Sequence, residues 1–267
     1  MSSQYEHITY ETADDRAYIT FDRPNAHNAL TEQMVYDIAD ALNRADEDDD
    51  VLAIIVTGAG DESFCAGGDL DTMIPAITSG EFPLGRGIAE DPDKDMMLKH
   101  NLIQTPIIAA VNGIAVAGGT EFLQATDIRV AEEHAQFGLA EVGWGLAPAG
   151  GSHTRLPRQI PYARAMEILL TGDRIDAEEA KQMGLVNKVV PKGEGLAAAE
   201  EYADSIAENG PLAVRKIKEA VVRCRSVPME QAFYTEEAIV AEALDSEDAR
   251  EGPRAFMENR EPEFEGK

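Results

Sequence analysis

Two stretches of this chain share an order of residues that strongly limits the possible folds: a short apolar segment, a turn or loop, and then a pair of glycines at the expected start of a helix. Residues 52–56 precede the first Ala-Gly-Gly, at 66–68, and residues 106–111 precede the second, at 117–119. Short segments that are wholly apolar are typical of strands buried on both faces of a sheet. The pattern predicts an α/β core in which two helices begin soon after buried strands.

The remaining segments fit one large domain with a helical extension. A hairpin is predicted from residues 7–12 and 16–22, and Thr31 is a candidate cap for the helix that follows. Helical patterns continue at residues 163–170, 176–183, 196–207, 211–223, 228–244 and 246–258. Strands and helices mix until about residue 190, and only helices follow. We therefore divide the 267 residues into an α/β core, 1–195, and a helical C-terminal region, 196–267.

Acidic residues dominate the charge of the chain. Asp and Glu number 50 against 23 Lys and Arg, so the net charge is −27. Long-range repulsion disfavours nucleic acids and anionic membrane surfaces as partners. In molar salt the Debye length falls to about 3 Å, and surface carboxylates are then screened from one another. The composition is typical of a halophilic protein in a salt-rich cytoplasm, and an acidic protein from an ordinary cell is the alternative.

The sequence indicates neither secretion, nor a membrane span, nor a metal centre. Cys65 and Cys224 are the only cysteines, and they show no spacing typical of a zinc site or a disulfide framework. Residues 1–16 lack the basic and apolar segments of a signal peptide. Residues 101–120 carry no charge, but their proline and glycines predict a buried strand, a turn and a helix start. We expect a cytoplasmic protein.

The two glycine-rich helix starts can present backbone hydrogen-bond donors. The first N–H groups of a helix have no intrahelical acceptor. If the fold brings Gly68 and Gly118 together, their N–H groups would form a two-donor pocket for an oxygen that gains negative charge. The alternative is that both segments are tight turns in which only glycine fits. The paired occurrence favours the functional interpretation.

Two glutamates lie in the least polar part of the sequence. Glu121 is the only charged residue between positions 101 and 124, and Glu141 lies between apolar and glycine-rich segments. Burial raises the pKa of a carboxyl group and suits it to proton transfer at neutral pH. In so acidic a chain each glutamate could instead be a solvated surface group.

Two other classes of enzyme lack support. The segment Thr-Gly-Ala-Gly at 57–60 lacks the third glycine of a dinucleotide loop, and Asp61 and Glu62 follow it. Neither a GxSxG nucleophile elbow nor a Walker A phosphate loop occurs.

Seven further motifs follow one another along the chain. They are FDRPNAHNAL at 21–30, SFCAGGDL at 63–70, AVNG through GGTE at 110–121, AQFG through Glu141, LLTG at 169–172, GLV at 184–186 and SEDAREG at 246–252. In these motifs and their order, the chain resembles the enoyl-CoA hydratase/isomerase, or crotonase, superfamily over nearly its whole length.

The resemblance implies a spiral of ββα units that binds an acyl-CoA thioester and a helical C-terminal region that assembles trimers or dimers of trimers. It implies an oxyanion hole made by the N–H groups of Gly68 and Gly118. It also implies that Glu121 activates water and that Glu141 protonates the α-carbon of a trans-2-enoyl-CoA. No metal or redox cofactor is expected, and coenzyme A enters as part of the substrate.

The resemblance also implies a set of substrate contacts: Ala26, His27, Ala66, Gly68, Asp69, Leu70, Gly118 and Trp144. One departure from the family pattern is Asp71, which stands where a lysine near the CoA phosphates is frequent. Two alternatives stay open, an isomerase or other acyl-CoA lyase of the same family and a non-catalytic acyl-CoA-binding scaffold. Isomerases of the family usually keep only the glutamate at the position of Glu141, so the pair favours a hydratase.

Overall fold

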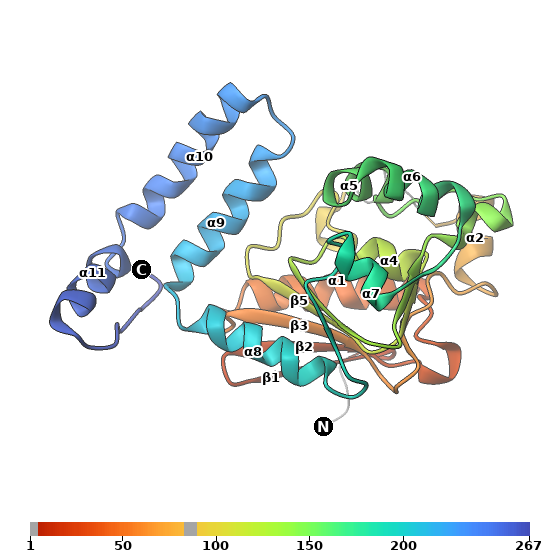
Figure 1. Ribbon diagram of the computed structural model, residues 1–267, viewed down its shortest axis with the longest axis horizontal. Coiled ribbons are helices and arrows are strands. Elements are labelled where there is room, and N and C mark those ends of the chain that lie inside the picture. The colour runs from red at the N-terminus through yellow and green to blue at the C-terminus, as the bar shows by residue number, and fades with distance from the viewer. Residues whose placement is uncertain (1–4, 83–89) are drawn as a thin grey trace.

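A computed structural model describes residues 5–82 and 90–267, and it contains two sheets. The larger sheet has the order β1-β2-β3-β5-β7-β10, and the smaller has the order β4-β6-β8-β9. Among the strand pairs of the described residues, only β1–β2 and β8–β9 are antiparallel. The strands are β1 (Ile8–Ala13), β2 (Arg16–Phe21), β3 (Ala53–Gly58), β4 (Ser63–Cys65), β5 (Ile107–Val111), β6 (Ile114–Val116), β7 (Ile128–Glu132), β8 (Gln136–Gly138), β9 (Ile175–Asp176) and β10 (Lys188–Val190). Figure 1 shows the larger sheet beneath α4.

The helices lie between the strands or form the C-terminal region. They are η1 (Pro24–Ala26), α1 (Glu32–Asp46), α2 (Met73–Ser79), η2 (Pro92–Lys94), α4 (Gly118–Leu123), η3 (Ala140–Trp144), α5 (Ser152–Gln159), α6 (Tyr162–Thr171), α7 (Ala177–Gln182), α8 (Gly195–Ala207), α9 (Pro211–Cys224), α10 (Met229–Leu244) and α11 (Asp248–Glu258). As expected, the Thr31 side chain accepts the N–H of Met34 and caps α1. The predicted hairpin is confirmed as β1–β2.

Successive units of the chain advance through both sheets together. β3, β5 and β7 are neighbours in the larger sheet, and the strands that follow them, β4, β6 and β8, are neighbours in the smaller one. α2 follows β4, α4 follows β6, and η3 follows β8. The result is the expected spiral of ββα units. Because β4, β6 and β8 run parallel, their carboxyl ends meet at one edge of the smaller sheet, and the segments after them converge there.

Alternate residues of the larger sheet enter two separate hydrophobic clusters, because side chains of a strand point to opposite faces. Ile54 and Val56 of β3 pack with α1 in the main core. Ala53 and Ile55 point to the other face, where α8 contributes Ala199 and two further alanines to the second cluster. Helix α8 therefore covers the sheet, although the division at residue 195 places it in the C-terminal region.

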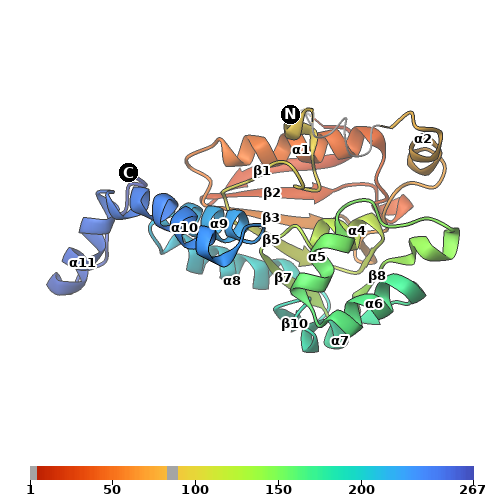
Figure 2. The ribbon, with the colours of Figure 1, turned by 90° about the horizontal axis from the view of Figure 1, so that it is seen from above.

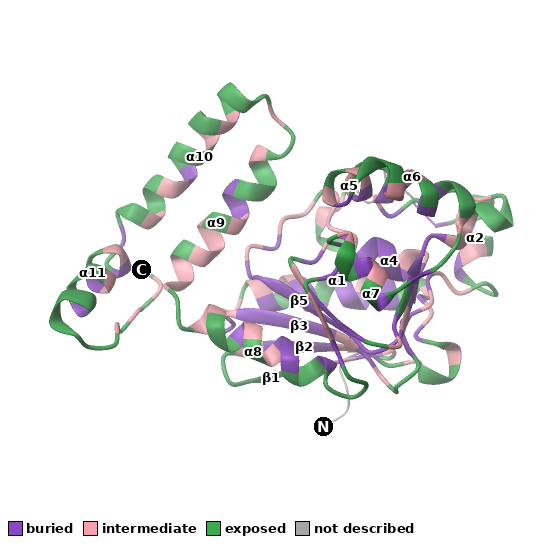
Figure 3. Cartoon of the chain, in the orientation of Figure 1, coloured by how far each residue is buried: buried purple, intermediate pink, exposed green. Residues whose placement is uncertain are grey.

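The helices after α8 extend away from the sheets. Figures 1 and 2 show α9 and α10 side by side as a hairpin, with α11 beyond them. Figure 3 shows α10 and α11 mostly exposed and α9 mostly half-buried, in contrast to the buried central strands β3 and β5. Large apolar side chains are exposed on them: Ile217, Val221, Val222, Met229, Phe233, Tyr234, Leu244, Phe256 and Met257. In the part of the chain that the structure describes, no helix combines the length and apolar character needed to cross a membrane.

Candidate active site

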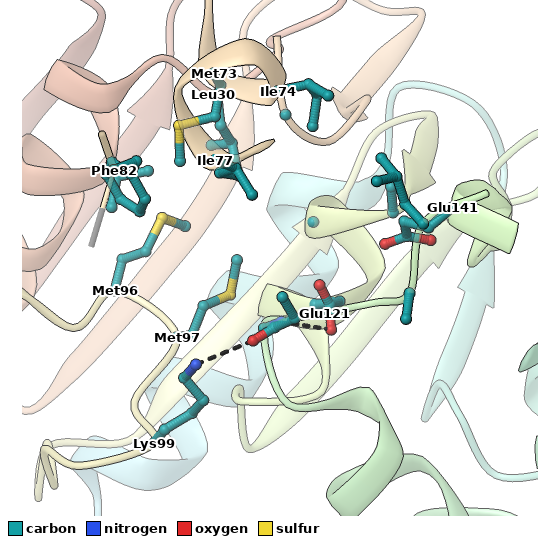
Figure 4. A pocket seen from close by; sticks show the side chains of 18 of the residues that line it. Leu30, Met73, Ile74, Ile77, Phe82, Met96, Met97, Lys99, Glu121 and Glu141 are labelled. Carbon is teal, nitrogen blue, oxygen red and sulfur yellow. Dashed lines mark hydrogen bonds between the residues drawn. The ribbon is translucent and has the colours of Figure 1, made fainter. Parts of the chain in front are cut away.

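A cavity of about 170 Å³ opens where the segments after β4, β6 and β8 converge. Its lining includes all four residues that we expected to be catalytic: Gly68, Gly118, Glu121 and Glu141. Figure 4 shows Glu121 and Glu141 on different segments of this cavity, with the apolar side chains of α2 on another wall. The parallel pairing of β4, β6 and β8 explains why residues more than 70 positions apart in sequence share one cavity.

The two predicted helix starts meet at the cavity. A Cβ atom built on Gly118 would lie 3.7 Å from the backbone nitrogen of Gly68 and 3.5 Å from Cα of Gly67. Gly67 has a φ of +90°, and a Cβ there would lie 2.7 Å from that of Ala117. A side chain at Gly67 would therefore force the two segments apart. Glycine is required at this contact because of both the close approach and the left-handed backbone.

The N–H groups of Gly68 and Gly118 have no protein acceptor within the described residues. Leu30 bridges the segment around Gly68: its N–H donates to the carbonyl of Gly67 at 2.7 Å, and its carbonyl accepts the N–H of Asp69 at 2.9 Å. Gly118 is the first residue of α4, where an N–H has no intrahelical acceptor. Two fixed donors therefore lie side by side beside the cavity, an arrangement suited to an oxyanion.

Glu121 is buried in the first turn of α4, with only 4% of its surface exposed. Its Oε1 atom accepts the N–H of Gly150 at 2.8 Å and the N–H of Ser152 at 3.2 Å. These bonds come from the segment that leads into α5, and they fix one oxygen of the carboxylate. The Oε2 atom accepts no hydrogen bond from the residues that the structure describes.

Glu141 is half-buried in the first turn of η3, directly after the segment that follows β8. Its buried Oε2 atom has no hydrogen-bond partner within the described residues. Burial raises the pKa of Glu141 to about 7, and the charge of Glu121 adds to the increase. The group therefore exchanges a proton near neutral pH, which suits an acid or base in catalysis.

The other walls of the cavity are mainly apolar. The apolar lining side chains come from α1 and the segment before it, from α2 and the segment after it, and from the segments around residues 96 and 146: Leu30, Val35, Met73, Ile74, Ile77, Phe82, Met96, Met97 and Leu146. Methionine side chains are flexible and adapt to irregular shapes. Lys99 also lines the cavity and donates to the carbonyl of Ala149 at 3.0 Å (Figure 4).

The other expected substrate contacts do not line this cavity: Ala26, His27, Ala66, Asp69, Leu70 and Trp144. The N–H of Ala66 donates to the carbonyl of His27 at 3.0 Å, and Ala66 directly precedes Gly67 and Gly68 in the chain. Leu70 and Trp144 expose 60% and 69% of their surface. These residues stay predictions as substrate contacts.

Asp69 has a clear structural role. Its Oδ1 atom accepts the N–H groups of Asp71 and Thr72, and its Oδ2 atom pairs with Arg23 at 3.0 Å. Burial alone would raise the pKa of Asp69, but the bonds to Thr72 and Arg23 outweigh it and lower the pKa. The carboxylate thus holds the turn that leads from Gly68 into α2.

Gly150 and Ser152, whose N–H groups orient Glu121, were not predicted from the sequence. A Cβ at Gly150 would lie 2.8 Å from Glu121 Oε2 and 2.9 Å from its Cδ. The glycine pair at 150–151 before a helix was the available signal, because the same pattern occurs at Gly68 and Gly118.

Comparison with known proteins agrees with this geometry. Residues 11–267 match the family model described as "Enoyl-CoA hydratase/isomerase". The chain is 46% identical to an enoyl-CoA hydratase of Mycobacterium tuberculosis, with 93% of this chain and 92% of the relative covered. It is 35% identical to a short-chain-enoyl-CoA hydratase of Clostridium acetobutylicum, with 97% and 98% covered. The solved structure of an enoyl-CoA hydratase from Bacillus anthracis superposes with a TM-score of 0.88 at 34% identity, covering 98% of this chain and 100% of the other.

The fold and the site therefore define a protein of the crotonase type. The chain belongs to the enoyl-CoA hydratase/isomerase family.

Proposed function

We propose that this protein is an enoyl-CoA hydratase, a hydro-lyase that adds water to a trans-2-enoyl-CoA and forms a 3-hydroxyacyl-CoA. The observation that carries the proposal is the presence of two glutamates, Glu121 and Glu141, in the cavity that also contains the paired glycines. The full-length similarity to relatives named as enoyl-CoA hydratases supports the same activity.

The glycine N–H groups would hold the oxygen of the thioester carbonyl. As the nucleophile attacks the β-carbon, electrons move from the double bond toward this oxygen, and an enolate forms. Gly68 and Gly118 would stabilise its negative charge more strongly than they stabilise the neutral carbonyl, which lowers the barrier. A donor of this kind contributes about 3 kcal/mol to transition-state stabilisation.

The two glutamates would move the protons. Glu121, oriented by Gly150 and Ser152, would take a proton from water as the oxygen bonds to the β-carbon. Glu141, whose pKa of about 7 leaves a large protonated fraction at neutral pH, would give a proton to the α-carbon. One water is consumed, and its hydroxyl and a proton are added across the double bond. Proton exchange between the two carboxyl groups would then restore the starting state.

An isomerase needs only a proton taken from one carbon and returned to another, which a single carboxyl group can do. The second glutamate, Glu121, is buried and held by two N–H groups beside the cavity. Burying a carboxylate is costly unless it is hydrogen-bonded. The presence of a second carboxylate that is buried and held in this way favours hydration over isomerisation. It also argues against a non-catalytic scaffold.

We propose that α9, α10 and α11 join copies of the chain into trimers or dimers of trimers. The exposed apolar side chains on these helices support the assignment, because contiguous exposed apolar surface marks interaction sites. The proposed enzyme acts in the cytoplasm on an acyl-CoA thioester and uses no separate cofactor.

The test is the loss of conjugated-enoyl absorbance when the protein, in about 1 M KCl, is mixed with crotonyl-CoA. We expect rapid loss with the unmodified protein and a rate at least about 100-fold lower with Glu121→Gln. Glu133→Gln is the control, because Glu133 is exposed and lies outside the cavity. If a 3-enoyl-CoA reacts and a 2-enoyl-CoA takes up no water, the protein is an isomerase.

A further inference from the structure

A second cavity, of about 560 Å³, lies between the core and α9. The core contributes residues of β7 and α5, and α9 contributes Val214, Ile217, Lys218 and Val221. Neither the paired glycines nor the two glutamates of the proposed active site line it. The reaction proposed above makes no use of this cavity.

The charge of this cavity is opposite to the charge of the chain. Asp and Glu outnumber Lys and Arg by 50 to 23 in the sequence. The described cavity lining reverses the ratio: Arg129, Arg155, Lys218 and Arg225 face a single carboxylate, Asp127. Lys218 pairs with Asp127 at 2.6 Å, so that carboxylate is already matched. Three guanidinium groups are left without a carboxylate in the lining.

The partners of the three arginines are neutral or lacking. Arg129, of which 7% is exposed, donates to the carbonyls of Leu185 and Thr126 and to the amide oxygen of Gln159. Arg155 donates to the carbonyls of Met97 and Leu98.

Arg225, at the end of α9, is exposed and makes neither a hydrogen bond nor an ion pair with any residue the structure describes. Within a single chain, none of the five N–H donors of its guanidinium therefore has a partner among the described residues.

The three positive charges also act on one another. The pKa of Arg129 is lowered to about 10, chiefly by burial; Asp127 opposes the decrease, and the charges of Arg155 and Arg225 contribute to it. Burial, followed by Arg225, lowers the pKa of Arg155 as well, while Asp95 and Glu121 oppose the decrease. A bound anion would relieve this repulsion.

We propose that the cavity between α9 and the core binds a small oxyanion of the phosphate or carboxylate class. Arg225 supplies the direct donors, and Arg129 and Arg155 supply positive charge from the core side. The planar guanidinium matches two oxygens of such an anion, which favours an oxyanion over chloride. Since Arg225 belongs to the α9 end and Arg155 to α5, the anion connects the C-terminal hairpin to the core.

The test compares thermal unfolding of the full-length protein with and without about 10 mM potassium phosphate, at constant ionic strength set with KCl. A ligand that binds only the folded state raises the unfolding temperature, here by about 2–4 °C. Arg225→Gln should abolish the rise. Arg158→Gln is the matched control, because Arg158 is exposed on α5 and does not line the cavity. Its variant should retain the full rise.

The oxyanion site is overturned by either of two results. In the first, phosphate gives the same shift in Arg225→Gln as in the unmodified protein, or no shift in either. In the second, Arg225→Gln lowers the assembly mass in sedimentation while phosphate has no effect, which would mean that a carboxylate of a second copy fills the cavity. Neither readout depends on the hydratase reaction.

Discussion

Gly150 donates its backbone N–H to Glu121 Oε1 at 2.8 Å, and a Cβ at Gly150 would lie 2.8 Å from the other oxygen of the same carboxylate. The main chain at residue 150 therefore packs directly against the carboxyl group. Glu121 can occupy this position only because residue 150 has no side chain. The glutamate is held by the chain that leads into α5, in addition to its own helix.

Replacing Gly150 by alanine should displace the Glu121 carboxylate. We expect kcat for hydration to fall at least about tenfold, with a smaller change in KM, because a proton-transfer group is shifted while the acyl cavity is retained. Steady-state kinetics with crotonyl-CoA measure both constants. Gly143→Ala is the control: a Cβ there meets no atom within 4 Å, so its kinetics should match those of the unmodified protein.

The pKa of Glu141 predicts the direction of the pH dependence. Burial first, and then the charge of Glu121, raise this pKa to about 7. A general acid is active when protonated, so kcat/KM for hydration should decrease about tenfold for each pH unit above about 7. A pH–rate profile measures the effect, and Glu141→Gln should remove the decrease along with most of the activity. A rate that instead increases up to pH 7 would make Glu141 the base.

The net charge of −27 predicts that salt stabilises the fold. Carboxylates close together on the surface repel one another at low ionic strength, and molar salt screens them. The unfolding temperature should therefore be higher in about 2 M KCl than in about 0.1 M KCl, and activity or assembly should be lost after dialysis into low salt. Circular dichroism measures the unfolding temperature, and sedimentation measures the mass of the assembly. An unchanged unfolding temperature and unchanged mass would contradict adaptation to salt.

The C-terminal hairpin should lose its assembly function when its apolar surface gains charge. Phe233 on α10 exposes 56% of its surface, so Phe233→Asp should leave the monomer folded. We expect a lower mass in sedimentation equilibrium, because a buried unpaired charge at an interface is unfavourable. Glu236→Asp, on the same helix, preserves the charge and should keep the mass of the unmodified protein. If the oligomer persists in Phe233→Asp, the surface around Phe233 takes no part in assembly.

The sequence alone was enough to predict the local elements and to single out Gly68, Gly118, Glu121 and Glu141, which line the cavity. Apolar runs predicted β3 and β5, Thr31 predicted the start of α1, and the glycine pairs predicted the donors at Gly68 and Gly118. These features depend on short-range effects: the burial of adjacent side chains, the capping of the first turn, and the backbone angles that glycine tolerates.

The tertiary structure decided which of these residues meet. The parallel order β4-β6-β8 brings Gly68, Gly118 and Glu141 to one edge, and the segment at Gly150 comes back to Glu121 from α5. Sequence spacing does not reveal strand order, so neither the donors to Glu121 nor the cavity beside Arg225 was visible in it. The physical reason is that burial, close approach and the mutual repulsion of charges depend on distances between segments, and those distances exist only once the chain has folded.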